Sequence, residues 1–189
     1  MRTKPAEQRR GELLDATERL VTERDTDAFT IEDVTTRAGV AKGTFYLHFA
    51  NKSELLRALR ERYVGRFVER QRVAAGEATG VESVERWLRT GVAEYLRDLR
   101  LHDVLFHPLE RAGAEEPNAA VTALTALLAE LRFPVQDPEA TAVILYSAMH
   151  GAADHIVHNP DDERRILDAL TRMCHTLVPT PGVGSDAHG

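Results

Sequence analysis

Apolar and small side chains recur three or four positions apart along most of the chain. Between residues 7 and 24, one face of a helix would hold Leu13, Leu14, Thr17, Leu20 and Val21. The same period, with proline at several boundaries, predicts helices over 30–38, 42–49, 52–75, 81–99, 101–107, 117–131, 138–157 and 162–177. No segment alternates in the way that a half-buried strand does. We therefore expect an all-α fold of about nine helices.

Two of these helices are separated by a short turn. Thr30 and Asp33 form a capping-box-like pattern at the start of helix 30–38. Gly39 ends that helix, because glycine accepts the positive φ of a tight turn. The turn 39–41 leads directly into the next helix. A helix, a three-residue turn and a second helix make a helix-turn-helix, whose second helix enters the major groove of DNA.

The second helix of this pair has an unusual outer face. Phe45 and Phe49 lie one turn apart and are expected to point inward. The outward positions then hold Gly43, Thr44, Leu47 and His48, flanked by Lys42 and Tyr46. A solvent-exposed helix face normally carries several charges, and this one carries almost none. We interpret it as a contact surface.

These residue types suit contacts with DNA. Gly43 permits close approach of the backbone, whereas Thr44 and Leu47 can contact base edges. The side chains placed to reach phosphates are those of Tyr46, His48 and Lys52. Lys52 also lies at a helix N-terminus, where free N–H groups favour an anion.

The segment from Thr30 to Lys52 closely resembles the DNA-binding helix-turn-helix of the TetR family of bacterial transcriptional regulators. The family pattern is matched here by Thr30, Val34, Ala38-Gly39-Val40, Gly43-Thr44, Tyr46, His48-Phe49 and Lys52. The resemblance spans about residues 7–60. Our DNA-binding candidates are Thr30, Lys42, Gly43, Thr44, Tyr46, Leu47, His48 and Lys52.

Three positions depart from the family pattern. Thr35 replaces an alanine on the inward face, and its hydroxyl would have to bond the Ile31 carbonyl to be buried. Ala41 replaces a serine before the second helix and cannot cap it, which costs about 1 kcal/mol. The loop 24–28 lacks the glycine that commonly precedes the helix 30–38. These departures affect local stability more than function.

The chain is expected to contain two domains. We predict a DNA-binding domain over 1–51 and a second helical domain over 52–178, connected by helix 52–75. Residues 179–189 show no periodicity and are expected to be a disordered tail. The resemblance implies that the second domain binds a small effector and forms a homodimer.

Two helices near the C-terminus bear on dimerisation. Helix 138–157 is apolar all round, which indicates burial on both sides. A partner subunit would cover one side most simply, and the resemblance implies a four-helix dimer interface made by the last two long helices. Our interface candidates are Leu145, Ala152, Ile156, Ile166, Leu170 and Met173. The alternative is burial within a single chain.

The effector pocket implied by the resemblance would need apolar walls with a few polar groups. The candidates to line it are Trp87, Tyr95, Phe106, His107, Met149 and His150. The alternative for each of them is an ordinary core position.

Three side chains on one helix face could hold a metal. His150, Asp154 and His158 follow one another at four-residue spacing. No cysteine-rich or His-Glu-x-x-His signature accompanies them. We therefore expect no metal and no cofactor, with metal sensing kept as an alternative. Cys174, the one cysteine of the chain, is expected to be a small buried hydrophobic residue.

Charge is distributed unevenly along the chain. Residues 1–75 hold 15 Lys and Arg against 12 Asp and Glu, whereas residues 76–189 hold 9 against 18. A weakly basic first part suits a polyanionic partner. The chain shows no secretory signal, no cysteine pair and no uncharged stretch longer than 140–153, which is too short to cross a bilayer. We expect a cytoplasmic protein without membrane contact.

These observations favour a one-component transcriptional regulator, most simply a repressor. A homodimer would bind a palindromic double-stranded DNA operator, and an unidentified small-molecule effector would release it. The alternatives are a DNA-binding dimer without a ligand and a small helical enzyme. The sequence contains no Gly-rich phosphate loop, nucleophile elbow or paired-carboxylate motif to support an enzyme.

Overall fold

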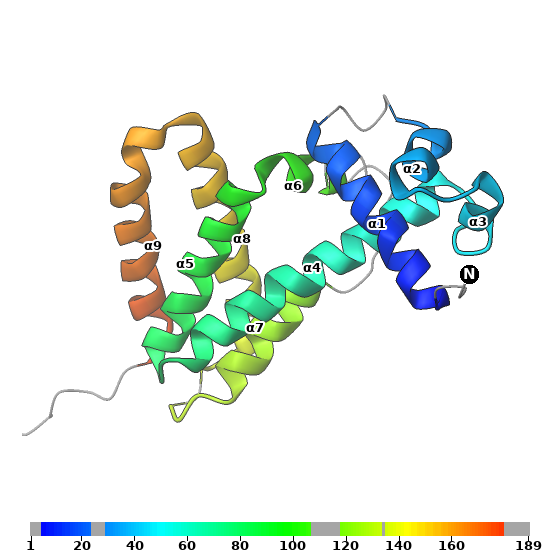
Figure 1. Cartoon of the computed structure of the whole chain (residues 1–189). Helices are drawn as coiled ribbons and strands as arrows, with labels where there is room; N and C mark the ends of the chain where they lie inside the picture. The colour runs from blue at the N-terminus through cyan, green and yellow to red at the C-terminus, as the bar shows by residue number, and fades with distance from the viewer. Residues whose placement is uncertain (1–4, 24–28, 107–117, 134, 180–189) are drawn as a thin grey trace, which may run out of the picture. The chain divides into compact units, whose positions relative to one another are not determined.

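The computed structural model describes residues 5–23, 29–106, 118–133 and 135–179. Within these ranges the chain forms nine α-helices, one 3₁₀ helix and no strand (Figure 1). The α-helices are α1 (Ala6–Glu23), α2 (Ile31–Ala38), α3 (Lys42–Tyr46), α4 (Lys52–Gly76), α5 (Val81–Arg97), α6 (Leu99–Phe106), α7 (Ala119–Ala129), α8 (Pro138–His158) and α9 (Glu163–Leu177). The 3₁₀ helix η3 (Pro160–Asp162) lies between α8 and α9. The prediction of an all-α fold of about nine helices is confirmed.

The largest difference from the predicted helices is at α3, which ends three residues early. The chain leaves the helix in a turn, where the amide of Leu47 donates to the Thr44 carbonyl (3.3 Å) and that of His48 to the Phe45 carbonyl (2.9 Å). Such i→i+3 bonds tighten the end of a helix. The predicted tail, apart from Pro179, lies outside the described residues.

The chain divides into two compact units, and α4 runs from one into the other. The first unit contains the described residues up to Tyr63 together with α6, and the second contains 64–97 and the described residues from 118 onward. The first unit thus includes more than residues 1–51, because the first half of α4 and α6 pack with α1.

In the first unit, α1 is held by α2, α4 and α6. Its apolar stripe is buried, with Leu13 and Val21 fully inaccessible to solvent. Arg62 of α4 donates to Asp15 (2.7 Å) and to Glu18 (2.5 Å) of α1. Arg100 of α6 donates to the Thr22 carbonyl at the other end of α1 (2.8 Å). These contacts fix the helix against which the helix-turn-helix packs.

The second unit is built around α5 and α8, with α7 and α9 packed on them. Trp87 of α5 and Met149 of α8 lie in its core with 1% and 0% of their surface exposed. Glu94 of α5 is a buried carboxylate, and it is ion-paired with Arg70 and Arg97. A buried carboxylate needs such partners, because an unpaired buried charge is strongly destabilising.

Candidate nucleic-acid interface

The start of α2 is a complete capping box. Thr30 has the extended backbone of an N-cap (φ −107°, ψ 167°), and its Oγ1 accepts from the Asp33 amide at 3.2 Å. The Thr30 amide donates to Asp33 Oδ2 at 2.7 Å. The Thr30 hydroxyl also donates to that carboxylate at 2.8 Å. The predicted cap is confirmed, and the assignment of Thr30 to the DNA-binding set stays a prediction.

Removing this cap should destabilise the domain. We expect Thr30→Ala to lower the free energy of unfolding by about 1 kcal/mol, because the side-chain acceptor for the Asp33 amide is lost. Thr30→Ser keeps that oxygen and is expected to match the wild type closely. Urea denaturation followed by circular dichroism measures both variants. Equal midpoints for the alanine and serine variants would contradict the role of the cap.

The turn between α2 and α3 has the backbone that its sequence predicts. Gly39 is left-handed (φ 67°, ψ 36°), and the Val40 amide bonds the Thr35 carbonyl at 3.0 Å. Ala41 makes no side-chain cap to α3, as expected. The expected partner of the buried Thr35 hydroxyl was wrong: it donates to the Glu32 carbonyl at 3.1 Å rather than to Ile31. A threonine side chain in a helix can reach the carbonyl three or four residues before it, and here the hydroxyl donates to the one three residues before.

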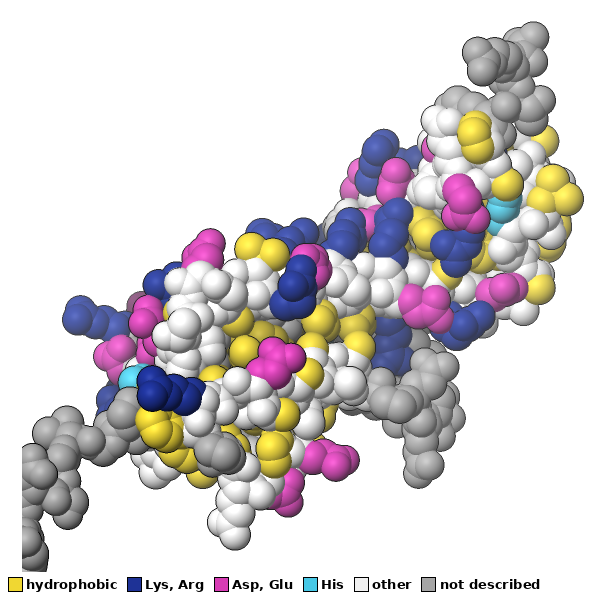
Figure 2. Space-filling view, turned by 90° about the horizontal axis from the view of Figure 1, so that it is seen from below, with side chains coloured by type: hydrophobic (Ala, Val, Ile, Leu, Met, Phe, Trp, Pro, Cys, Tyr) yellow, Lys and Arg dark blue, Asp and Glu magenta, His cyan; other side chains and the backbone are white. Residues whose placement is uncertain are grey.

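The faces of α3 and its turn are as predicted. Phe45 and Phe49 are buried (0% and 2% exposed), with ring centroids 5.7 Å apart. Leu47 is 81% exposed and Tyr46 is 52% exposed. Lys42 and Gly43 are exposed as well, whereas Thr44 and His48 are half-buried. Figure 2 shows hydrophobic side chains and a histidine at the surface of the end that holds α2 and α3. A leucine so exposed gains nothing from water and is available to a partner.

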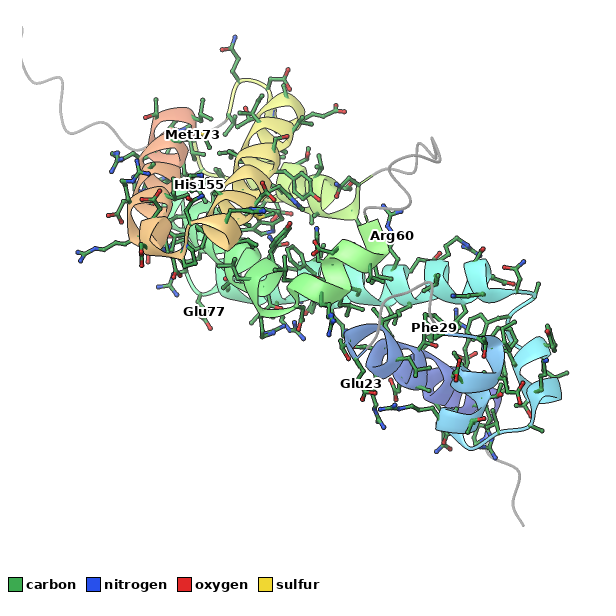
Figure 3. The ribbon with its side chains drawn as sticks, turned by 90° about the horizontal axis from the view of Figure 1, so that it is seen from above. Glu23, Phe29, Arg60, Glu77, His155 and Met173 are labelled. Atoms are coloured by element: carbon green, nitrogen blue, oxygen red, sulfur yellow. The ribbon has the colours of Figure 1, made fainter. Side chains whose placement is uncertain are left out.

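Lys52, at the start of α4, has a role that the sequence did not reveal. Its ammonium donates to the Phe29 carbonyl at 2.8 Å and lies 4.0 Å from the centroid of the Phe29 ring. Phe29 is labelled in Figure 3 and is buried. Lys52 therefore ties α4 to the segment before α2, and its contact with a phosphate stays a prediction. The two residues are 23 positions apart, so no local pattern could pair them.

Four of the six effector-pocket candidates lie in the second unit. Trp87, Tyr95 and Met149 are buried in the second unit, and His150 is half-buried. The Tyr95 and His150 rings meet edge to face at 5.6 Å. The Phe106 side chain and all of His107 lie outside the described residues.

A buried amide between two of these candidates was missed by the sequence analysis. Gln71 of α4 is 0% exposed, and its Nε2 donates to the Trp87 carbonyl (3.3 Å) and toward Met149 Sδ (3.5 Å). Its Oε1 is buried and accepts no hydrogen bond within the described part of the chain. Gly91 belongs to the same cluster, since a Cβ there would lie 2.1 Å from Met149 Sδ. A buried acceptor without a donor is destabilising and marks a position that a polar ligand could satisfy.

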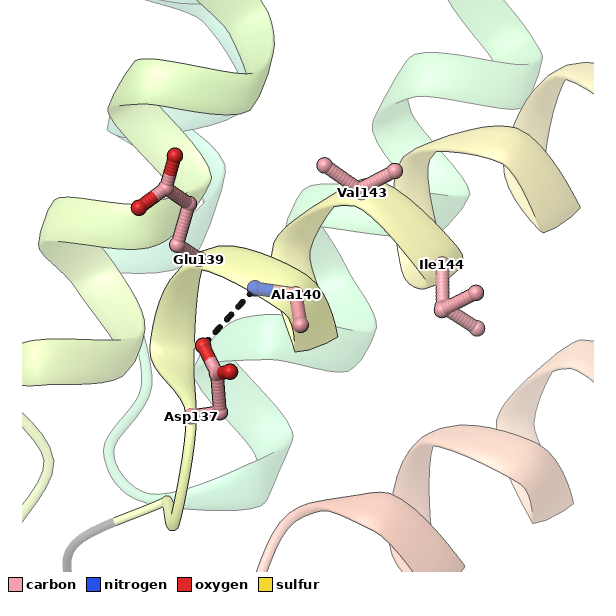
Figure 4. A pocket seen from close by; sticks show the side chains of 5 residues that line it. All are labelled: Asp137, Glu139, Ala140, Val143 and Ile144. Carbon is pink, nitrogen blue, oxygen red and sulfur yellow. Dashed lines mark hydrogen bonds between the residues drawn. The ribbon is translucent and has the colours of Figure 1, made fainter.

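A surface hollow of about 390 Å³ lies elsewhere, at the start of α8. It is lined by Asp137, Glu139, Ala140, Val143 and Ile144, and none of the pocket candidates takes part (Figure 4). The Asp137 carboxylate caps α8 by accepting from the Ala140 amide at 3.0 Å. Val143 and Ile144 are exposed by 45% and 55%. The hollow is thus an open apolar surface with an acidic edge.

Four of the dimer candidates are buried within the protomer, and their place in a dimer interface stays a prediction. Within the chain, Leu145, Ile156, Leu170 and Ala152 are exposed by 0%, 4%, 5% and 9%. Such side chains have almost no surface to offer a partner. Ile166 and Met173 are half-buried, and Met173 is labelled on α9 in Figure 3. The exposed stripe of α8 instead runs through Ala140, Ile144, Ser147 and Gly151.

The described residues contain no group of three or more His, Cys, Asp or Glu side chains placed to hold a metal ion. His158 Nδ1 lies 2.8 Å from the Asp154 carbonyl, and His155 Nε2 lies 2.9 Å from Asp162. Hydrogen bonds from Arg165 and His155 hold the pKa of Asp162 at about 2.

Cys174 is fully buried, as predicted, and desolvation raises the pKa of its thiol to about 12. In the described ranges, no helix is both long and apolar enough to cross a membrane.

Comparison with known proteins finds a likeness to a family of regulators within the first unit. Residues 13–59 match the model described as bacterial regulatory proteins, tetR family. The transcriptional activator FasR of Mycolicibacterium smegmatis is 36% identical over 75 residues, which are 40% of this chain and 34% of FasR. The match therefore spans about a third of the length of that curated relative.

Solved structures extend the likeness to the whole fold. A putative TetR-family regulator from Mesorhizobium loti has a TM-score of 0.77 at 14% identity, over 94% of this chain and all of the other. SmeT, the repressor of the Stenotrophomonas maltophilia multidrug efflux pump SmeDEF, has a TM-score of 0.64 at 24% identity, over 95% and 94% of the two chains. At these identities the likeness shows the fold alone.

Proposed function

We propose that the protein is a one-component transcriptional regulator, because residues 13–59, which include the helix-turn-helix, match the model of the tetR family of bacterial regulatory proteins. It binds a palindromic operator as a homodimer, and a small molecule bound by the second unit releases it. The observation that carries the proposal is the outer face of α3 and its turn, where Leu47 is 81% exposed beside Tyr46 and Lys42. The fold and the matched domain are those of transcriptional regulators, which are not enzymes.

On DNA, α3 enters the major groove. Thr44 and Leu47 contact base edges, and Gly43 lets the backbone approach. Lys42, Tyr46 and His48 are exposed or half-buried around them and contact phosphates or neighbouring edges. Thr30 and Lys52 complete the candidate set at the ends of α2 and α4. The buried pair Phe45 and Phe49 holds this surface on the domain.

The homodimer forms through α8 and α9. On α8 the exposed stripe Ala140, Ile144, Ser147 and Gly151 advances by four, three and four residues, which is the spacing of a helix–helix seam. On α9 the matching stripe is Ile166, Ala169, Met173 and Leu177, which are half-buried or exposed. A second copy related by two-fold symmetry covers both stripes and the apolar hollow at Val143 and Ile144. The same symmetry matches two half-sites of a palindrome.

The effector binds in the core of the second unit, near Gln71, Trp87 and Met149. The unsatisfied Gln71 Oε1 supports a ligand that carries a hydrogen-bond donor on an apolar body. A flexible methionine can move aside for such a ligand. A solved complex of SmeT with triclosan, 22% identical to this chain at a TM-score of 0.62, adds support for a small-molecule ligand in this fold.

Release follows from a difference in affinity. The effector must bind the DNA-free conformation more tightly than the DNA-bound one, and it then shifts the population between them. Helix α4 connects the first unit with the second, because it carries Lys52 in the first unit and Gln71 in the second.

Selection from a library of random duplexes tests the proposal. The selected sequences are expected to share an inverted repeat, bound with one dimer per site in a fluorescence-anisotropy titration. Triclosan and other phenols of similar size, added to that complex, are the first probes for release. Selection that enriches no sequence would refute specific regulation. Transcription from a promoter that contains the selected site distinguishes repression from activation, the activity named for the FasR relative.

Replacing Lys52 tests both of its roles. We expect Lys52→Ala to weaken binding to all duplexes similarly and to make the dependence of log K on log salt shallower by about one unit per protomer, since one phosphate contact is lost. The variant should also unfold at lower urea, because the bond to the Phe29 carbonyl is removed. Anisotropy titrations at several salt concentrations measure the slope. An unchanged slope together with lower stability would leave Lys52 a purely structural role.

A further inference from the structure

Arg10, in the second turn of α1, is held against the end of the α3 region. Its guanidinium carbon lies 5.2 Å from the centroid of the Phe49 ring. Phe49 is buried and directly follows Leu47 and His48, two residues of the candidate interface. The aromatic contact therefore fixes a cationic side chain at the edge of that interface.

The polar edges of this guanidinium have no partner among the described residues. Among the residues that the structure describes, Arg10 forms no hydrogen bond and no ion pair. Its neighbour Arg9 is paired with Glu12 at 3.0 Å. Arg62, on α4, is paired with two carboxylates of α1. A cation–π contact does not use the N–H donors of a guanidinium as hydrogen-bond donors to oxygen, so they stay available to an acceptor.

We propose that Arg10 is a DNA phosphate contact that Phe49 holds in position before DNA binds. The inference rests on the proposed DNA binding of this domain. A planar guanidinium presents parallel N–H groups that match the oxygens of a phosphate, and stacking on a ring reduces the rotamers that binding must freeze. Phosphate contacts from the protein flank its base contacts and set its register on the duplex. Arg10 takes this place beside Leu47 and His48.

The salt dependence of DNA binding tests the assignment. We expect Arg10→Gln to make the slope of log K against log salt shallower by about 0.9 per protomer on a labelled mixed-sequence duplex, because one released counterion is lost. Arg19→Gln is the matched control: it removes the same charge from the same helix at an exposed position. Arg19→Gln is expected to keep the wild-type slope. Arg10→Lys retains a cation and is expected to keep most of the slope.

Melting temperatures are measured for all variants, so that a folding defect is separated from a lost contact. A folded Arg10→Gln protein with the wild-type slope would overturn the inference and leave the proposed function standing. Equal loss of slope in the Arg10 and Arg19 variants would also overturn it, because the effect would then be one of total charge. A wild-type protein that binds no duplex would remove the proposed function and this inference with it.

Discussion

Replacing Ile144 with glutamate is expected to convert the homodimer to a folded monomer. Ile144 is 55% exposed on α8, so the substitution leaves the core of the protomer intact. In the dimer the new carboxylate would be buried against a second copy, where an unpaired charge is strongly unfavourable. Affinity for the palindromic operator should then fall by about 10²–10⁴, because the two recognition helices no longer bind as one unit.

Two control variants make this result specific. Val73→Glu places the same charge at another exposed apolar position (54% exposed), on α4, and is expected to leave the dimer unchanged. Leu145→Glu, one residue from Ile144, is expected to unfold the second unit because Leu145 has no exposed surface. Sedimentation velocity measures mass, and circular dichroism measures folding. A dimeric Ile144→Glu protein would place the interface elsewhere.

The adjacent residues Leu145 and Ile144 show that the sequence does not predict which side of this helix faces the core of the protomer. Helix 138–157 is apolar on all sides, so its period identifies a buried helix without telling which side faces the protomer's own core. Neighbouring positions on a helix point about 100° apart. The period could not show that Leu145 is buried within the protomer, and its place in a dimer interface stays a prediction. The bounds of the helix were confirmed within one residue.

The helix-turn-helix was far more predictable, because its signals are local. Thr30 caps the helix three residues upstream of Asp33, and Gly39 adopts the positive φ that ends it. Phe45 and Phe49 are buried because they lie one helical turn apart on an apolar face.

Contacts between distant positions were not predictable. The Lys52 ammonium bonds Phe29, and Gln71 lies between Trp87 and Met149, a residue 78 positions away. A single sequence contains no pattern for such pairs, since they depend on how the helices pack. The unsatisfied Gln71 carbonyl became visible only in the packed core.

Replacing Leu47 with alanine is expected to weaken binding to the operator and to leave binding to mixed-sequence DNA nearly unchanged. The reason is geometric: Leu47 is 81% exposed, whereas Phe45 and Phe49 turn inward. Covering a leucine side chain contributes about 1.5–3 kcal/mol, which corresponds to about 10–100-fold in affinity per protomer if the contact is complete. Thr44→Ala should likewise cost about 1–3 kcal/mol on the operator alone, because base contacts specify and phosphate contacts position.

The partner of Leu47 can be identified from the DNA side. A thymine methyl is the apolar group that the major groove presents, and uracil lacks it. Replacing the contacted thymine by uracil should weaken the wild-type complex by about 0.8 kcal/mol per methyl group and leave the Leu47→Ala complex nearly unchanged. Anisotropy titrations on operators with one uracil at each thymine position measure this coupling. If the two proteins respond alike at every position, Leu47 does not read a thymine, and its exposure in the turn after α3 must serve another contact.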